Sequence, residues 1–495
     1  MNLEPREHVP AGVSRRKVLA SGAALAALAA AGGTGATLDR AGVHAPAAVT
    51  RSGSAAVRNL IFLVSDGMSA GTLSLTDHFL RHTTGTASHW TRLAATAAAH
   101  RSLVSTHAAD SIVTDSAAAS AAWSTGVKHN NGALCIGPDG RVLKPLLMRA
   151  KAQGKRVGVV TTTTVTHATP AGFYANCPSR DLQADIGRIL VESPVDVALG
   201  GGSAFVQAEL TAGNAGIRRV QTRAELLSLD AGSLAGKRLI GTFDADHLRM
   251  VLDRPATQPA LEEMARVAIA ALADGPDGFV LQIEAGRVDH AAHNNDACSL
   301  LAEQLEFDRT LALVAEFTLA RSDTLLIATT DHGTANPGLT MYGKETFESL
   351  RRLGNGRRSF EWLFSQLKAA PAQGTSPDGS GATPPKLTPA AAAARLGVLV
   401  KEHLDIDLGP SRTAFLERAF RGEQADPFAE RGIPAAVLGS LLASDLGVAF
   451  VSPHHTADHI EQLALGAAAD TWPGFLDNTQ VHAHLVRLLA LPPVG

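Results

Sequence analysis

The sequence predicts an α/β fold, a three-layer α/β/α sandwich whose central sheet is mostly parallel and is covered by helices on both faces. Short runs of β-branched and aliphatic residues end abruptly in polar residues, and helical patterns lie between these runs. The composition agrees with this fold class, because 495 residues that are 45% hydrophobic and 18% charged form ordinary globular material with a large core.

Five segments are predicted as buried strands. They are NLIFLVSDG (59–67), RVGVVTTTT (156–164), VDVALGGG (195–202), GFVLQIEAG (278–286) and TLLIATTDHG (324–333). Helical patterns lie between or after them, at 145–154, 261–275 and 395–404, and Gly275 is suited to the end of the second. In such sheets, ligands bind beyond the carboxyl ends of the strands.

The first 55 residues predict a leader. Arg15 and Arg16 precede an alanine-rich apolar run that is too short and too weak for a stable membrane anchor. This order is that of a twin-arginine export signal, so we expect a periplasmic or secreted protein; the alternative is an ordinary amphipathic N-terminal helix. The folded part is predicted as one catalytic domain over residues 56–495.

Within that domain, residues 341–445 are predicted as a loop-rich insertion near the active-site entrance. Residues 369–395 are rich in Pro, Gly and Ser and predict a flexible surface excursion. The arginines of RRLGNGRR (351–358) are interpreted as a solvated loop. The formal charge of -3 gives no attraction to nucleic acid or to an anionic membrane.

Three cysteines, Cys135, Cys177 and Cys298, argue against a disulfide framework because their number is odd. One disulfide bridge with one free thiol remains an alternative.

Two further patterns carry little weight. CPSR (177–180) lacks the residue between Cys and Pro that a sulfatase motif needs, and GGG (200–202) lacks the spaced glycines of a dinucleotide site.

Acidic and histidine side chains gather at the predicted strand ends. These are Asp66, Glu284, Asp331 and His332. Asp289 and His293 are four residues apart, so one helical face carries both. SPHHTADHIE (452–461) adds His454 or His455 as a further ligand. Such a set can hold two or three divalent metals in one cleft, and paired metals suit an in-line phosphoryl displacement.

Ser116 follows Thr114 and Asp115 at the start of an alanine-rich helix, so a capping role explains the local sequence without chemistry. No G-x-S-x-G elbow surrounds it. A nucleophilic role therefore requires that metal coordination lower the pKa of its hydroxyl.

From about Asn59 to the C-terminus these motifs, in their order and spacing, resemble the alkaline phosphatase family. The resemblance casts TDSAAASAAWSTGVK as the nucleophile motif, with Ser116 phosphorylated in a covalent intermediate. It implies two zinc ions, one held by Asp289, His293 and His455, the other by Asp66, Asp331 and His332. His455 is preferred to His454 because the family's ligand precedes a motif like HTAD.

The resemblance also implies a third, magnesium-type site with Asp66, Thr169 and Glu284. Arg180 would grip phosphate, and Asp115 would orient its guanidinium. His167 stands where bacterial members often carry Asp, so this site could take zinc or cobalt as well as magnesium. His290 stands where some members carry a phosphate-contacting lysine; it is either a phosphate contact or a solvent-facing neighbour of a ligand. Asp458 is a candidate to orient His455.

The function expected is therefore an exported alkaline phosphatase that hydrolyses small-molecule phosphate monoesters. A phosphodiesterase or phosphotransferase on the same metals is the nearest alternative. Others are an exported metal- or phosphate-binding protein without turnover, and a serine hydrolase acting on carboxylic esters. A homodimer is an expectation from the resemblance.

Overall fold

The computed structural model describes residues 56–211, 216–230, 237–340, 342–367, 387–423 and 434–492. The predicted twin-arginine leader, residues 1–55, lies outside the described residues. Residues 54–495 form one compact unit. No helix in the described part of the chain is long and apolar enough to cross a membrane.

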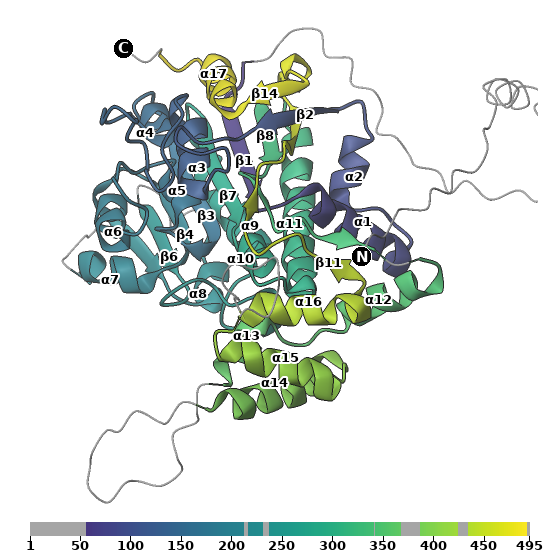
Figure 1. Cartoon of the computed structure of the whole chain (residues 1–495). Helices are drawn as coiled ribbons and strands as arrows, with labels where there is room; N and C mark the ends of the chain where they lie inside the picture. The colour runs from purple at the N-terminus through teal and green to yellow at the C-terminus, as the bar shows by residue number, and fades with distance from the viewer. Residues whose placement is uncertain are drawn as a thin grey trace, which may run out of the picture. The chain divides into compact units, whose positions relative to one another are not determined.

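A ten-stranded sheet with the order β14-β2-β13-β8-β1-β7-β3-β4-β6-β5 forms the centre of the molecule (Figure 1). Its strands are β1 (Asn59–Ser65), β2 (Ala99–Ser105), β3 (Arg156–Thr164), β4 (Val197–Gly201), β5 (Ile217–Val220), β6 (Arg238–Thr242), β7 (Phe279–Ala285), β8 (Thr324–Thr329), β13 (Ile460–Gly466) and β14 (Phe475–Asp477). Only β13 runs against its neighbours, β2 and β8, among these strands. The mostly parallel sheet predicted from the sequence is thus confirmed.

Helices cover both faces of this sheet, because successive residues of a strand point to opposite sides. Along β1, Leu60 and Phe62 join one apolar core with Trp123, whereas Ile61 and Leu63 join a second core. The continuous apolar run of β1 therefore serves two helical layers. This is the predicted three-layer sandwich.

The helices of the two layers follow the strands in chain order. They are α1 (Ala70–Thr84), α2 (His89–Ala94), α3 (Ser116–Thr125), α4 (Leu146–Lys151), α5 (Ala168–Ala171), α6 (Gln183–Glu192), α7 (Ser203–Thr211), α8 (Arg223–Leu227), α9 (Leu261–Leu272), α10 (Arg287–His293), α11 (Ala297–Leu319) and α17 (Asn478–Leu488), with the 3-10 turns η2 (Val251–Asp253) and η3 (Ala469–Thr471). Two small antiparallel ribbons pair β9 (Gly333–Thr334) with β12 (His455–Thr456) and β10 (Gly338–Leu339) with β11 (Val448–Ala449).

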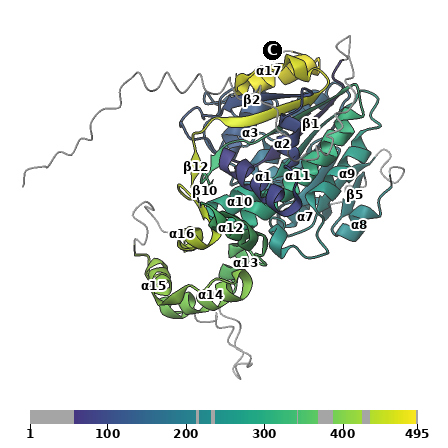
Figure 2. The ribbon, with the colours of Figure 1, turned by 90° about the vertical axis from the view of Figure 1, so that its right-hand side faces the viewer.

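Residues 341–445 were expected to be rich in loops, but their described part is largely helical. The helices are α12 (Lys344–Gly354), α13 (Phe360–Ser365), α14 (Pro389–Leu404), α15 (Gly409–Phe420) and α16 (Pro434–Leu446). They share a third apolar cluster that includes Leu363, Leu399 and Leu442. Both ribbon views draw α13 and α16 next to α10 (Figures 1 and 2). The stretches 368–386 and 424–433 lie outside the described residues, and the first of them holds most of the Pro/Gly/Ser-rich excursion predicted at 369–395.

The arginines expected in a solvated loop at 351–358 begin within helix α12 instead, at Arg351 and Arg352. The three cysteines, Cys135, Cys177 and Cys298, are all buried with free thiols. The disulfide bridge left open by the sequence is therefore absent from the described residues.

Candidate active site

The register of the parallel strands brings the predicted carboxylates to one edge of the sheet. Val64 of β1 lies beside Glu284 of β7 on one side and beside Thr329 of β8 on the other. Asp66, Glu284 and Asp331 consequently end adjacent strands at the same level. All three side chains are fully buried.

Gly67 allows this crowding. Its φ of 71° lies in the left-handed region, and a Cβ there would stand 2.6 Å from Oδ1 of Asp289. Its N–H donates to Oδ1 of Asp331 at 3.1 Å. Gly67 therefore lets the end of β1 lie closer to Asp289 of α10 and to Asp331 after β8 than a larger residue would allow.

Three histidines are held at Nδ1 and turn Nε2 toward the carboxylates. Nδ1 of His293 donates to the carbonyl of Pro453 at 2.6 Å, and Nδ1 of His455 donates to the carbonyl of Thr114 at 2.9 Å. Nδ1 of His332 lies 3.2 Å from the hydroxyl of Thr334. Second contacts of this kind are typical of histidines that bind a metal through the other nitrogen.

The Nε2 atoms of His293 and His455 face each other at 3.0 Å. Since both rings carry their proton on Nδ1 when neutral, two lone pairs point at each other across this gap. Nε2 of His293 also lies 3.2 Å from Oδ2 of Asp289. Burial lowers the pKa of His293, but the Asp289 charge outweighs it and raises the pKa to about 9. A cation between these two nitrogens and Asp289 would therefore be stabilised, whether it is a proton or a metal ion.

In each of three groups of side chains, the ligand atoms lie close enough together to bind one metal ion. The groups are Asp289, His332 and His455; Asp66, Asp331 and His332; and Asp66, His167 and Glu284. The second group equals the predicted second zinc set. The first shares Asp289 and His455 with the predicted first set but holds His332 in place of His293, which contacts both other members.

Several buried atoms in these groups have no hydrogen-bond partner among the described residues. They are Oδ1 of Asp66, Oδ2 of Asp331, Oε1 of Glu284 and Nδ1 of His167. Buried polar atoms are normally satisfied. Burial, together with the charges of Asp331 and Asp289, raises the pKa of Asp66 well above its ordinary value. Burial raises the pKa of Glu284 to about 7. The three unpartnered carboxylate oxygens fit divalent metal ions, whose charge would relieve the repulsion.

Ser116 is the first residue of α3 and is 2% exposed. Asp115 caps the helix, and its Oδ1 accepts from the N–H of Ala118 at 2.9 Å. Oγ of Ser116 lies 3.3 Å from Nε2 of His332, a member of two ligand groups. Capping and a position beside the ligands are therefore properties of the same turn, as the sequence suggested.

The contact between Ser116 and His332 is not that of a serine hydrolase triad. In a triad the acid holds Nδ1 of the histidine while Nε2 faces the serine. Here Asp331 lies 3.2 Å from Nε2, on the nitrogen that also faces Ser116. The geometry therefore disfavours the carboxylic esterase alternative.

Arg180 lies between Asp115 and His167. Nη1 of Arg180 donates to Oδ2 of Asp115 at 3.1 Å, as the resemblance implied, and Nη2 donates to Nε2 of His167 at 3.1 Å. The guanidinium is therefore fixed at two points. Nearby, the hydroxyl of Thr169 donates to Oδ2 of Asp66 at 3.3 Å. Thr169 therefore lies next to the third group, which consists of Asp66, His167 and Glu284.

Comparisons with known proteins agree with this arrangement. The alkaline phosphatase family model matches residues 57–362. The chain belongs to the alkaline phosphatase family. Alkaline phosphatase 4 of Bacillus subtilis is 31% identical over 316 residues, which cover 61% of this chain and 67% of the relative. The crystal structure of Thermus thermophilus alkaline phosphatase is 32% identical with a TM-score of 0.78, over 88% of this chain and 92% of that one.

A cold-active alkaline phosphatase from a psychrophilic Shewanella species is 25% identical with a TM-score of 0.70, over 88% of this chain and 100% of that one. The chain is therefore a phosphatase, a metal-binding hydrolase of phosphate monoesters. Both the family and the enzyme class predicted from the sequence are confirmed.

In this alkaline phosphatase, a cluster of three histidines borders the third ligand group. His167 lies 5.5 Å from His247 and 5.6 Å from His290, and the rings of His247 and His290 lie 4.7 Å apart, as centroid distances. Burial lowers the pKa of His247 to about 4 and lowers that of His290 well below its ordinary value, and Arg287 adds to both effects. His290 is thus a half-buried member of this cluster, and not the solvent-facing neighbour left open by the sequence.

Sequence reasoning missed His247, Arg287 and Glu361. His247 follows β6 by five residues, so the rule that polar residues gather beyond strand ends could have found it. Arg287 stands inside the IEAGRVDHAAH motif, but its partner Glu361 lies 74 positions further on. That long separation left no local signal.

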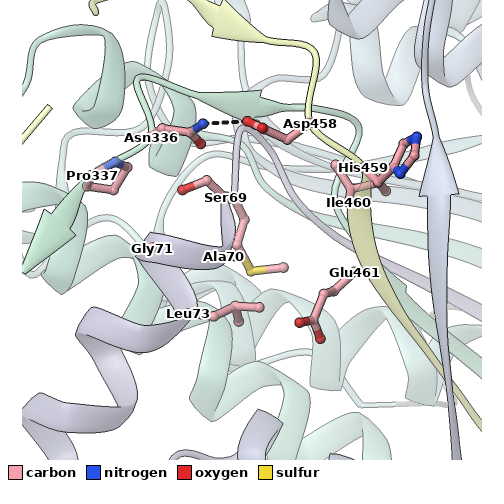
Figure 3. Close-up of a pocket in the computed structure, with 12 residues that line it drawn as sticks. Ser69, Ala70, Gly71, Leu73, Asn336, Pro337, Asp458, His459, Ile460 and Glu461 are labelled. Atoms are coloured by element: carbon pink, nitrogen blue, oxygen red, sulfur yellow. Dashed lines mark hydrogen bonds between the residues drawn. The ribbon is translucent and has the colours of Figure 1, made fainter. Parts of the chain in front are cut away.

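Asp458 does not orient His455. Its carboxylate accepts a hydrogen bond from Asn336, and the carbonyl of Thr114 holds Nδ1 of His455 instead. Figure 3 shows Asp458 turned toward Asn336 at the rim of a pocket of about 350 Å³. His454 is exposed and belongs to none of the three ligand groups, so the choice of His455 over His454 agrees with the geometry.

Proposed function

We propose that this enzyme is an exported alkaline phosphatase that hydrolyses phosphate monoesters through a covalent phosphoserine on Ser116. The position of Ser116 carries the proposal, since it starts α3 beside His332 and next to Asp115, the partner of Arg180. A helix N-terminus offers free N–H groups and partial positive charge to an anion.

The metal ions proposed are two zinc ions and one magnesium ion, with zinc or cobalt as alternatives to magnesium because His167 offers nitrogen. Asp289, His293 and His455 would hold the first zinc, and Asp66, Asp331 and His332 the second. Asp66, Thr169, Glu284 and His167 would surround the third ion, directly or through water. When bound, such ions lower the pKa of the serine hydroxyl and stabilise charge on oxygen. Elemental analysis of the purified protein tests this assignment.

The protein residues then have distinct tasks. Arg180 binds two non-bridging oxygens of the phosphoryl group. A monoester has a third such oxygen that remains available to other ligands, whereas a diester has only two. Ser116 attacks phosphorus in line, the bond to the ester oxygen breaks, and the alcohol leaves. Water then cleaves the phosphoserine and regenerates the hydroxyl. Asp115 and His167 keep the guanidinium in place throughout.

The variant Ser116→Ala tests the covalent step. We expect turnover of p-nitrophenyl phosphate to fall by at least about 1000-fold, because no other hydroxyl replaces the nucleophile. Metal content should stay near that of the wild type. Acid quenching during turnover should trap labelled phosphoprotein in the wild type and none in the variant.

Ser124→Ala is the matched control, because Ser124 lies on the same helix and accepts from the N–H of Leu146, away from the candidate ligands. Its turnover should stay close to the wild-type rate. Wild-type turnover in Ser116→Ala would exclude the covalent mechanism. Faster cleavage of bis(p-nitrophenyl) phosphate than of the monoester would favour the phosphodiesterase alternative.

The export route is proposed from Arg15 and Arg16 and the apolar run behind them. Replacing both arginines with lysine should retain the enzyme in the cytoplasm if the twin-arginine route is used. Continued export of that variant would contradict it. A homodimer is proposed from family membership, and sedimentation of the mature protein would determine the oligomeric state.

A further inference from the structure

Arg287 joins the active-site helix α10 to the outer segment, by which we mean the described residues of 342–446. The residue is 3% exposed and begins α10, two positions before Asp289. Nη1 of its guanidinium donates to Nδ1 of His290, and Nη2 donates to the carboxylate of Glu361 on α13. One buried cation therefore contacts a histidine of the active-site cluster and an acid of the outer segment.

The contact with Arg287 determines which nitrogen of His290 carries the proton. A guanidinium only donates hydrogen bonds, so Nδ1 of His290 must accept. The proton of the neutral ring is then on Nε2, which points away from Arg287. The N–H of Thr164 donates to Nδ1 of His247 at 3.1 Å, so the proton of that neutral ring also sits on Nε2. Two neighbouring imidazoles are thus both held as Nε2–H donors.

These donors lie close to the proposed phosphate site. The ring of His290 is 5.6 Å from that of His167, and His167 accepts a hydrogen bond from Arg180. Without the fixed donor at Nδ1, His290 could exchange its tautomer or turn its ring. A lone pair would then replace an N–H group near the bound anion, and an oxyanion is repelled by a lone pair.

Glu361 is firmly placed for this task. The residues just before it are anchored to the sandwich, because the N–H of Phe360 donates to Oδ2 of Asp296 at 2.7 Å and Ser359 bonds to Asp253. The side chain of Glu361 is 42% exposed, whereas that of Arg287 is 4% exposed. Glu361 therefore supplies the negative charge that a buried guanidinium requires.

We propose that Glu361 and Arg287 are positioning residues that hold His290 as an Nε2–H donor toward bound phosphate. The inference rests on the proposed function and extends it, because it makes the outer segment part of phosphate recognition. Neither residue touches the reacting atoms. Their effect should therefore pass through His290 and should appear in phosphate affinity, not in the chemical step.

A double-mutant cycle between Glu361 and His290 tests this coupling. Glu361→Ala in the metal-loaded enzyme should raise both KM and the inhibition constant of inorganic phosphate about three- to tenfold, with kcat within about twofold. In the His290→Ala background the same substitution should leave the phosphate inhibition constant unchanged. Glu361→Gln retains an acceptor for Arg287 and should recover most of the affinity.

Glu348→Ala is the matched control, since Glu348 is a carboxylate of the same segment that pairs with Arg351 on α12. It should leave the phosphate inhibition constant at its wild-type value. Equal effects of Glu361→Ala in both backgrounds, or no effect in the wild-type background, would overturn the proposal. Calorimetric titration with inorganic phosphate gives the same comparison without turnover, so this outcome is separate from any failure of the phosphoserine mechanism.

The tautomer of His290 gives a second, spectroscopic measurement. Long-range proton–nitrogen correlation spectra distinguish a protonated ring nitrogen from one that carries a lone pair, and the His290→Ala variant identifies the signal. Wild-type Nδ1 should be unprotonated, and Glu361→Ala should add the other tautomer. A wild-type His290 protonated at Nδ1 would contradict the geometry directly.

Discussion

The ligand cluster at the sheet edge and the outer segment are built in opposite ways. The cluster collects buried charged residues from strand ends far apart in the chain, from Asp66 to His455. The outer segment comes from one stretch of the sequence, and its helices pack around an apolar cluster that also includes Leu75 of α1 and Leu301 of α11. Besides these apolar contacts, it meets the sandwich through hydrogen bonds at the start of α13, to Asp253, Asp296 and Arg287.

The ligand cluster is therefore expected to serve the chemistry, and the apolar packing to serve the stability of the fold. Crowded carboxylates such as Asp66 and Asp331 cost folding free energy, so the sheet and its two apolar cores must hold them together. The helices of the outer segment contribute to the fold by burying apolar side chains. Substitutions in the ligand cluster should therefore change activity far more than stability, and substitutions of the buried apolar residues of the outer segment should do the reverse.

The largest effect is expected for Asp66→Asn. Asp66 belongs to two of the three ligand groups, so its loss weakens both. We expect kcat/KM for p-nitrophenyl phosphate to fall by more than about 1000-fold, or about 4 kcal/mol of transition-state stabilisation. Elemental analysis of the same preparation should show lost metal.

Asp458→Asn is the control for this prediction, because its carboxylate accepts from Asn336 outside the three ligand groups. Its kcat/KM should stay within about twofold of the wild type. Comparable losses in the two variants would mean that acidic charge in general, and not the ligand position of Asp66, supports activity.

A smaller effect, on stability, is expected for Leu399→Ala in α14. Leu399 is 2% exposed within the apolar cluster of the outer segment. Truncation removes buried methyl groups and leaves a cavity, which costs about 2–5 kcal/mol. Hydrogen exchange of the amides of α14 and α15 should accelerate accordingly, while kcat stays within about twofold.

Val398→Ala, one position earlier, is the matched control because Val398 is 57% exposed. It should change the unfolding free energy by less than about 0.5 kcal/mol. If Leu399→Ala instead abolished activity without faster exchange, the separation between the two regions would be wrong.

The sequence predicted the cluster better than the outer segment for physical reasons. Strand-end residues such as Glu284 and Asp331 are tied to their positions by local patterns, and parallel register then brings them together. The Glu361 contact with Arg287 depends on how α13 docks, which no local pattern encodes. The antiparallel strand β13 was also not predicted. Its sequence, IEQLALG, has no flanking turn signal that would distinguish a strand from a short helix.

The smallest predicted effect concerns Asp296, at the junction of the two regions. Burial raises its pKa from 3.8 to about 6, although Ser299 and the N–H of Phe360 oppose this. Between about pH 4 and pH 6 the folded protein therefore binds more protons at Asp296 than the unfolded chain, so its contribution to stability falls as the pH rises. Because the pKa rises only from 3.8 to about 6, this loss is at most about 3 kcal/mol.

Asp296→Asn cannot ionise, so the stability advantage of the wild type over this variant should shrink from pH 4 to pH 7 in urea unfolding. Asp405→Asn in the outer segment should behave oppositely, because a hydrogen bond from Lys401 lowers the pKa of Asp405 and its benefit appears as the pH rises. If the wild type instead became more stable relative to Asp296→Asn as the pH rose, the N–H groups of Ser299 and Phe360 would be stabilising a charged carboxylate. The junction would then be an ionic anchor, like Arg287 with Glu361, and not a buried neutral cap.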